Sequence, residues 1–206
     1  MKNTFTIILV IMALCGSVFG QYAGDPDLTF NGTGKLIYDN DFVDLYKDVQ
    51  VQSDGKIIAV GTSIASTYMT STIVVSRLLG NGTFDPSFGT NGHFVYSQDM
   101  FVDAAKCIIK DNGKILIGGM TTDYATYEML VMQLDENGNL DPDFGVNGVA
   151  KVNSSTFELA VSAMALQGGN ILLGGYAIDA DYRNAPVLLR LSETGELDTS
   201  FGVNGI

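Results

Sequence analysis

Basic residues are scarce in this sequence, which has 11 Lys and Arg against 23 Asp and Glu and a formal net charge of −12. Proteins that wrap nucleic acid need clustered Lys and Arg to neutralise phosphates, so this composition argues against a nucleic-acid partner. The chain also has no Trp, one His and only two Cys. Such a composition offers no Cys or His cluster for zinc and excludes a disulfide framework.

Glycine and apolar residues are plentiful instead. The 206 residues include 24 Gly, and 46% of them are hydrophobic while 17% are charged. This balance supports a packed core, and so many glycines indicate many turns between short strands.

The first twenty residues match a secretory signal. Lys2 is followed by the apolar run Phe5–Cys15, and small residues lead to a cleavage site between Gly20 and Gln21. The run is too short to span a bilayer, and Leu14 is not the small residue expected before a lipidated cysteine. No second long apolar stretch follows. We therefore expect a secreted, extracellular or cell-surface protein whose mature chain has no transmembrane segment and keeps Cys107 as its one thiol.

The mature chain is an internal repeat. Four blocks share the pattern Asp-x-x-Phe-(Gly or Asn)-x-x-Gly. Their phenylalanines are 58, 56 and 57 residues apart. We call them the Asp–Phe–Gly blocks. They occupy residues 27–34, 85–92, 141–148 and 198–205, with repeated positions Asp27, Phe30, Gly34, Asp85, Phe88, Gly92, Asp141, Phe144, Gly148, Asp198, Phe201 and Gly205.

A second motif keeps the same period. It has the form of a turn followed by an apolar run and a glycine, at residues 52–61, 110–119 and 166–175. Its repeated glycines are Gly55, Gly61, Gly113, Gly119, Gly169 and Gly175. Motifs in phase over the whole mature chain define a repeat architecture. The repeats run approximately over residues 24–81, 82–137, 138–194 and 195–206, the last one partial.

Each repeat predicts four antiparallel strands. In the first copy they are residues 35–39, 48–52, 56–62 and 73–79, and the second and third are joined by a hairpin turn at Ser53-Asp54-Gly55. The corresponding turns at 112–113 and 168–169 also suit a primed turn with positive φ. Four strands per repeat is the unit of a β-propeller blade, so we predict an all-β partial propeller of three complete blades and the start of a fourth. The Asp–Phe–Gly block would form the crossing between blades, with Asp in an Asx turn and Phe filling the seam.

The paired motifs resemble the delta-60 repeat of bacterial secreted proteins, a family expected to form β-propellers. The resemblance covers residues 24–206, although Thr29 and Asn31 depart from the pattern in the first block. It implies no catalytic residues. Because propellers close with about 4–8 blades, we expect this chain to be the front part of a longer protein. The alternative is a ring completed by several chains, since either further blades or self-association must close the propeller.

Variable loops over a repeated frame are where binding residues gather. Here they are the loops at 63–71, 121–127 and 176–185, joined on the same face by Asp41, Asp44, Asp99 and Asp103 of the loops between the first and second strands. Tyrosines and carboxylates suit a glycan or a peptide, because a ring offers a face for stacking and carboxylates accept hydrogen bonds from hydroxyl groups. The candidate binding residues are Tyr68, Asp123, Tyr124, Tyr127, Asp179, Asp181, Tyr182 and Arg183.

No catalytic residue is predicted. His93 stands where other copies carry Lys35 or Val149, which indicates a strand start, and Cys107 aligns with Val49 and Ala163 as a buried apolar position. Asp135–Asn139 fails the EF-hand spacing, so we predict no metal site or cofactor and leave only a looser calcium site among loop carboxylates open. The sequence favours a non-catalytic binding or scaffold module, with a glycan or a cell-surface protein as partner. The alternative is part of an extracellular glycan-degrading or lyase-type enzyme whose catalytic residues lie outside this chain.

Overall fold

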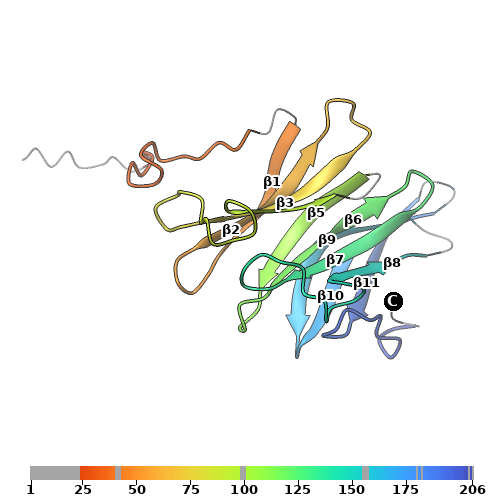
Figure 1. The fold of residues 1–206 in the computed structure, drawn as a ribbon. Helices are drawn as coiled ribbons and strands as arrows, with labels where there is room; N and C mark the ends of the chain where they lie inside the picture. Colours follow the sequence, from red (N-terminus) through yellow and green to blue (C-terminus); the bar gives the residue numbers. More distant parts are fainter. Residues whose placement is uncertain are drawn as a thin grey trace, which may run out of the picture.

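The structure is a computed structural model that describes residues 24–39, 43–97, 101–154, 158–179, 181, 183–203 and 205. The predicted signal sequence, residues 1–20, lies outside these residues. Within them every regular element is a strand (Figure 1), and no helix is long and apolar enough to cross a membrane. The strands are β1 (Val43–Val51), β2 (Ile57–Ile64), β3 (Ser71–Leu78), β4 (His93–Ser97), β5 (Phe101–Ile109), β6 (Ile115–Thr122), β7 (Tyr127–Leu134), β8 (Val149–Val152), β9 (Glu158–Gln167), β10 (Asn170–Ile178) and β11 (Asn184–Leu191).

The strands form three antiparallel sheets in chain order. The first sheet is β1-β2-β3-β4, the second is β5-β6-β7-β8, and the third is β9-β10-β11. Each sheet is a meander of sequential neighbours, and the three sheets lie side by side (Figure 1). This arrangement is a partial propeller, so the predicted fold class is confirmed.

The sheets and the sequence repeats are out of phase, which corrects two predictions. Residues 35–39 form no strand, and their counterparts in β4 pair with β3 of the repeat before them, with Ser76 opposite His93. The Asp–Phe–Gly block therefore lies inside a sheet, between its third and fourth strands, and does not form the crossing between sheets. A sheet takes its outer strand from the following repeat because the block folds back along the edge of the third strand, where Arg77 N donates to Gly92 O at 2.9 Å.

The hairpins differ from prediction in two of three cases. Both residues have positive φ only at Gly168 and Gly169, at 57° and 94°. In the other two hairpins only Gly55 and Gly113 are left-handed, at 83° and 81°. Asp54 and Asn112 therefore do not adopt the primed conformation, and each loop has the three-residue form in which a left-handed glycine follows an ordinary turn.

A bulge in the first strand of each sheet explains the second repeated glycine of the hairpin motif. The register shifts between Tyr46 and Asp48, and again between Ala104 and Lys106. Each bulge carries a backbone carbonyl towards the neighbouring strand. A Cβ on Gly61 would lie 1.9 Å from Leu45 O, and one on Gly119 would lie 2.1 Å from Asp103 O. Only glycine fits there, and Gly175 meets Ala160 O in the same way.

The hydrophobic core lies between sheets. One buried cluster joins the first and second sheets and includes Ile58, Val75 and Ile117. The other joins the second and third sheets and includes Leu116, Ile171 and Leu189. The second sheet is therefore covered on both faces, as expected for an inner blade.

The Asp–Phe–Gly block links one sheet to the next, as predicted for its phenylalanine. Phe88 is fully buried against the turn that follows β7, where a Cβ on Gly138 would lie 2.8 Å from its ring. Gly89 N also donates to Asn137 O at 2.7 Å across the seam. The same two contacts recur for Phe144 on Gly195 and for Gly145 N on Thr194 O. We call Gly82, Gly138 and Gly195 the socket glycines.

The aspartate of the block closes an Asx turn, which confirms the prediction made from its position. Oδ1 of Asp85 accepts from Ser87 N at 3.0 Å, and Oδ1 of Asp198 accepts from Ser200 N at 3.0 Å. Asp27 and Asp141 make the same bond. The turn directs the phenylalanine towards the neighbouring sheet.

Candidate functional site

The variable loops lie at one end of the sheets, opposite the hairpins and the Asp–Phe–Gly blocks (Figure 1). They are the β2–β3, β6–β7 and β10–β11 connections. Strand alternation places the crossings between sheets at this same end. We call it the loop end. Its residues carry little of the repeated pattern, which contrasts with the opposite end.

Tyr68 and Tyr124 occupy matching places in the first two of these loops. Both adopt a left-handed backbone, with φ of 59° and 67°, and their exposed fractions are 66% and 46%. Left-handed backbone is strained for a bulky side chain and is usually taken by Gly, Asn or Asp. Two tyrosines in this conformation keep two aromatic rings at the surface at a cost in stability.

The two loops also touch each other. Tyr124 Oη donates to Met69 O at 2.7 Å, which links the first and second sheets at the loop end. Met69 is itself exposed beside Tyr68. Tyr68, Met69 and Tyr124 are therefore exposed side chains at the junction of two neighbouring loops, and we call these three residues the tyrosine patch.

The predicted loop carboxylates mostly hold their own loops. Oδ1 of Asp123 accepts from Thr126 N and Ala125 N, and hydrogen bonds with Thr126 lower the pKa of this carboxyl. Asp179 Oδ1 accepts from Asp181 N and Arg183 N, both at 2.9 Å. Asp181 and Arg183 form an exposed ion pair at 2.9 Å. These groups are polar turn residues more than free acceptors.

The remaining predicted site residues separate from the patch. Tyr127 is half-buried at the start of β7, and Tyr182, Asp41 and Asp99 lie outside the described residues. Asp44 and Asp103 are in strands β1 and β5, which corrects their assignment to loops. Asp103 binds Lys47 Nζ at 2.5 Å and Thr62 Oγ1 at 2.9 Å, so it joins two sheets.

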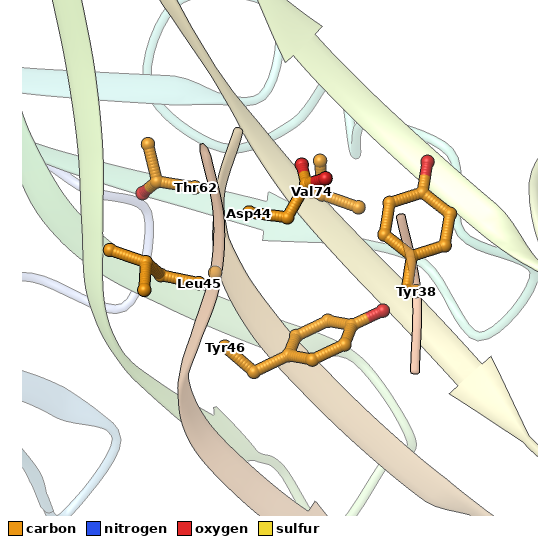
Figure 2. Close-up of a pocket in the computed structure, with 7 residues that line it drawn as sticks. Tyr38, Asp44, Leu45, Tyr46, Thr62 and Val74 are labelled. Atoms are coloured by element: carbon orange, nitrogen blue, oxygen red, sulfur yellow. The ribbon is translucent and has the colours of Figure 1, made fainter. Parts of the chain in front are cut away.

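The structure adds a small cavity that sequence reasoning missed. It has a volume of about 30 Å³ and is lined by Tyr38, Asp44, Tyr46 and Thr62, among others (Figure 2). Figure 2 shows Asp44 and Tyr46 on the side of β1 that faces Tyr38. The cavity lies on the face of the first sheet that points away from the second sheet.

A chain of hydrogen bonds runs beside this cavity. Tyr46 Oη lies 2.6 Å from Ser76 Oγ, which lies 2.8 Å from His93 Nδ1. The His93 ring packs between Tyr38 and Phe84, with centroids 4.8 and 4.3 Å away. Burial lowers the pKa of His93 and raises the pKa of Tyr46. The sequence does mark these three residues, because they depart from the repeat. The positions equivalent to Tyr46, Ser76 and His93 in the next copy are Ala104, Met132 and Val149.

Neither His93 nor Cys107 has the setting of a catalytic group. His93 begins β4, as predicted for a strand start, and no carboxylate within the described residues is hydrogen-bonded to its ring. Cys107 is 2% exposed, and burial raises its thiol pKa to about 12, so it behaves as the predicted apolar core residue. Among the described residues no three His, Cys, Asp or Glu side chains gather into a metal site.

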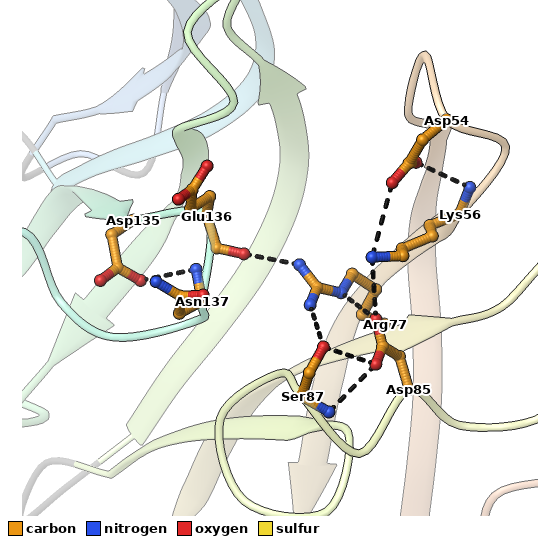
Figure 3. Close-up of polar contacts among 8 residues, drawn as sticks. All are labelled: Asp54, Lys56, Arg77, Asp85, Ser87, Asp135, Glu136 and Asn137. Atoms are coloured by element: carbon orange, nitrogen blue, oxygen red, sulfur yellow. Dashed lines mark hydrogen bonds and ion pairs between the residues drawn. The ribbon is translucent and has the colours of Figure 1, made fainter.

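The seam between the first two sheets carries a dense polar network (Figure 3). The Arg77 guanidinium donates to Asp85 Oδ2 at 2.8 Å, to Ser87 Oγ at 3.0 Å and to Glu136 O of the next sheet at 2.5 Å. It also lies 4.6 Å from the centre of the Phe88 ring. Burial alone would raise the pKa of Asp85, but bonds from Ser87 and the charge of Arg77 hold that pKa far below its usual value.

A family comparison agrees with this architecture. The model described as "Domain of unknown function (DUF5122) beta-propeller" matches residues 52–88, 110–144 and 169–201. The chain belongs to this family. No curated protein sequence is significantly similar to it. The match confirms the propeller repeat, and the narrower delta-60 resemblance stays a prediction.

The DUF5122 matches also show which parts of each sheet are shared. Each match begins beside a hairpin and ends at the phenylalanine of a block, at Phe88, Phe144 or Phe201. The two central strands and the block are therefore the common frame. Strand β1, with Asp44 and Tyr46, lies outside the matched segments. The cavity is thus built partly from residues that the family pattern does not specify.

Proposed function

We propose that this DUF5122 propeller is a secreted, non-catalytic binding or surface-scaffold module that binds its ligand through the tyrosine patch. The observation that carries the proposal is the left-handed backbone of Tyr68 and Tyr124. Each such residue costs about 1–2 kcal/mol relative to an ordinary conformation. Asn or Gly would adopt this backbone at a lower cost. We therefore infer that the aromatic rings serve the function of the site.

The chemistry of the patch favours a glycan or an extended peptide as ligand. Tyrosine rings present an apolar face for stacking and a hydroxyl for hydrogen bonding. A tyrosine side chain also loses little conformational freedom on binding. The thioether of Met69 adapts its shape to an apolar partner. The patch lies on a rigid frame, because the Tyr124–Met69 bond and the sheets below hold both loops.

The test compares the mature chain with the Tyr68→Asn/Tyr124→Asn variant. Asparagine tolerates the left-handed backbone, so this variant keeps the conformation of both turns while it loses the two rings and the Tyr124–Met69 hydrogen bond. We expect the unchanged chain to bind on a glycan array or a peptide array, and the variant to lose at least tenfold in affinity while its melting temperature stays equal or rises. Val146→Ala, which removes an exposed apolar group at the opposite end, is the matched control.

Two results would contradict the proposal. Equal binding by the double variant would move the site away from the tyrosine patch. Release of new reducing ends from a bound glycan would favour the enzyme alternative, because a binding module leaves its ligand intact.

A further inference from the structure

Asparagine followed by glycine is the dipeptide in which a protein chain changes its own covalent structure most readily. The glycine nitrogen attacks Cγ of the asparagine side chain, and the small glycine lets the peptide rotate into the required position. This chain has seven such pairs, at residues 31–32, 81–82, 91–92, 112–113, 137–138, 147–148 and 204–205. The reaction needs a glycine N–H that makes no hydrogen bond and open space around it, so the fold decides which pair reacts.

Six of the seven glycine nitrogens are engaged. Each donates to the carbonyl of a residue three or four positions earlier, at 2.8–3.2 Å, and the six are Gly82, Gly92, Gly113, Gly138, Gly148 and Gly205. Five of them are also crowded, because a Cβ placed there would lie 2.7–2.8 Å from a neighbouring side chain. Gly113 is the exception, since its nearest neighbour is 3.7 Å away and only the hydrogen bond protects it.

Gly32 lacks both kinds of protection. Its N–H donates to no atom in the part of the chain that the structure describes, and the residue is exposed. A Cβ placed on it would have no atom within 4 Å. Asn31 is exposed as well, with a left-handed φ of 48°. This pair therefore has the unbonded nitrogen and the open surroundings that the reaction requires.

A departure from the repeat explains why this nitrogen is left unbonded. In the second block the matching nitrogen is that of Thr90, which donates to His93 O at 2.7 Å. That close approach needs glycine at position 89, because a Cβ on Gly89 would collide with His93 O. Asn31 replaces this glycine in the first block. Its side-chain amide takes the carbonyl instead, since Nδ2 donates to Lys35 O at 3.1 Å.

We propose that Asn31 is a site of spontaneous deamidation, and that the reaction weakens the docking of the first block on the first sheet. The Gly32 nitrogen forms a bond to Asn31 Cγ, the Cγ–Nδ2 bond breaks, and Nδ2 leaves as ammonia with the proton of the Gly32 nitrogen. Water then opens the resulting succinimide ring and returns a proton to that nitrogen. Opening at Cγ gives aspartate, whereas opening at the backbone carbonyl carbon gives isoaspartate, whose main chain runs through Cβ and Cγ.

Both products disturb the contacts that hold the first block. Nδ2 of Asn31 is a donor to Lys35 O, and a carboxylate oxygen in its place is an acceptor facing an acceptor. Isoaspartate also lengthens the backbone within the turn that Gly34 N closes on Phe30 O at 2.8 Å. Phe30 is the ring that packs on the socket glycine after β3. The modification therefore loosens this turn and its contact with the first sheet.

The experiment follows deamidation of the mature chain during several weeks in mildly alkaline buffer, with and without urea. Peptide mass spectrometry gives the fraction of each pair in which the amide has become a carboxyl group. We expect Asn31 in the folded chain to react at least tenfold faster than Asn112, the matched control whose glycine has open space but a bonded N–H. In urea the rates should lie within a few-fold of one another, because every pair is then the same unprotected dipeptide.

A second measurement tests the loss of docking. Protein modified at Asn31 separates from unmodified protein by anion exchange, because it gains one negative charge. Trypsin cleaves after Lys35, and modified chains should be cut there at least threefold faster than fresh chains. Asn31→Gly, which copies Gly89 of the second block and cannot deamidate, should keep its initial cleavage rate through the same incubation.

Three results would overturn the proposal. Equal rates at Asn31 and Asn112 in the folded chain would remove the reason for singling out this site. A preference for Asn31 that persists in urea would do the same, since local sequence and not the fold would then set the rate. Modified chains that resist trypsin at Lys35 as well as fresh chains do would contradict the loss of docking. These outcomes are independent of ligand binding by the tyrosine patch.

Discussion

Phe88 packs against Gly138 across the seam between the first two sheets, and a Cβ on that glycine would lie 2.8–2.9 Å from three carbons of the ring. Gly138 also has a left-handed φ of 83°. Two separate demands, for space and for backbone conformation, therefore meet at one position. Together they make the socket glycine the most restricted residue of the turn.

Gly138→Ala is expected to destabilise the chain by about 3 kcal/mol, from left-handed strain and from displacement of a buried ring. Gly113→Ala is the matched control, because Gly113 has a φ of 81° but its nearest contact is 3.7 Å away. It is expected to cost about 1 kcal/mol. Urea unfolding of both variants measures the difference. Equal losses would mean that the ring moves aside freely and that the seam does not depend on this contact.

Arg77→Ala is expected to lower the free energy of unfolding by about 3 kcal/mol, because the buried Asp85 carboxylate loses its nearest cation and keeps only Lys56 at 3.3 Å as a charged partner among the described residues. Arg77→Gln is expected to be milder, since Gln133 holds Asp141 in the next block with a bond of 2.6 Å. Chemical denaturation of the two variants gives the comparison. A glutamine variant as unstable as the alanine variant would show that the charge, and not the hydrogen bond, holds the seam.

The same pair predicts acid sensitivity. Since the pKa of Asp85 is lowered on folding, its stabilising contribution is complete above the usual value of 3.8 and is lost as the pH falls below it. The Arg77→Gln variant should therefore show a weaker loss of stability in that acid range than the unchanged chain.

His93 predicts a second pH dependence, of a different origin. Burial lowers its pKa below 6.5, so the unfolded chain binds the proton more tightly than the folded chain does. Stability is therefore complete above that pH and falls as the pH drops below it. Thermal melts at about pH 7.5 and 5.5 should show the loss, and His93→Val, which copies Val149, should flatten the profile over that range. An unchanged profile in the variant would assign the effect to other groups.

The fold followed from the sequence because its signals are local and repeated. Phe30, Phe88, Phe144 and Phe201 set the period, and alternation around Val49 and Val51 marked a strand. The position in each repeat at which one sheet ends and the next begins could not be predicted, because a periodic sequence has no inherent starting point. Whether residues 93–97 pair with β3 or begin the next sheet depends on the path of the chain after Gly92, which no local pattern encodes.

Only some residues of the candidate site were singled out from the sequence, for a related reason. Tyr68 and Tyr124 were chosen as candidates because loops that differ between repeats stand out. Tyr46, Ser76 and His93 were missed because they are 17 and 30 residues apart and meet only when β1, β3 and β4 align. Comparing each repeat position by position, and not only the loops, would have marked these polar residues against Ala104, Met132 and Val149.

The coupling of Phe88 to Gly138 has a consequence for how such proteins change over generations. Each unit of about 57 residues carries both halves of the joint, a ring at one end and a matching glycine in its own turn. A duplicated unit inserted in frame therefore arrives with a compatible joint on either side. Gain or loss of a blade requires no new interface, and the loops at the opposite end are free to diverge in every copy.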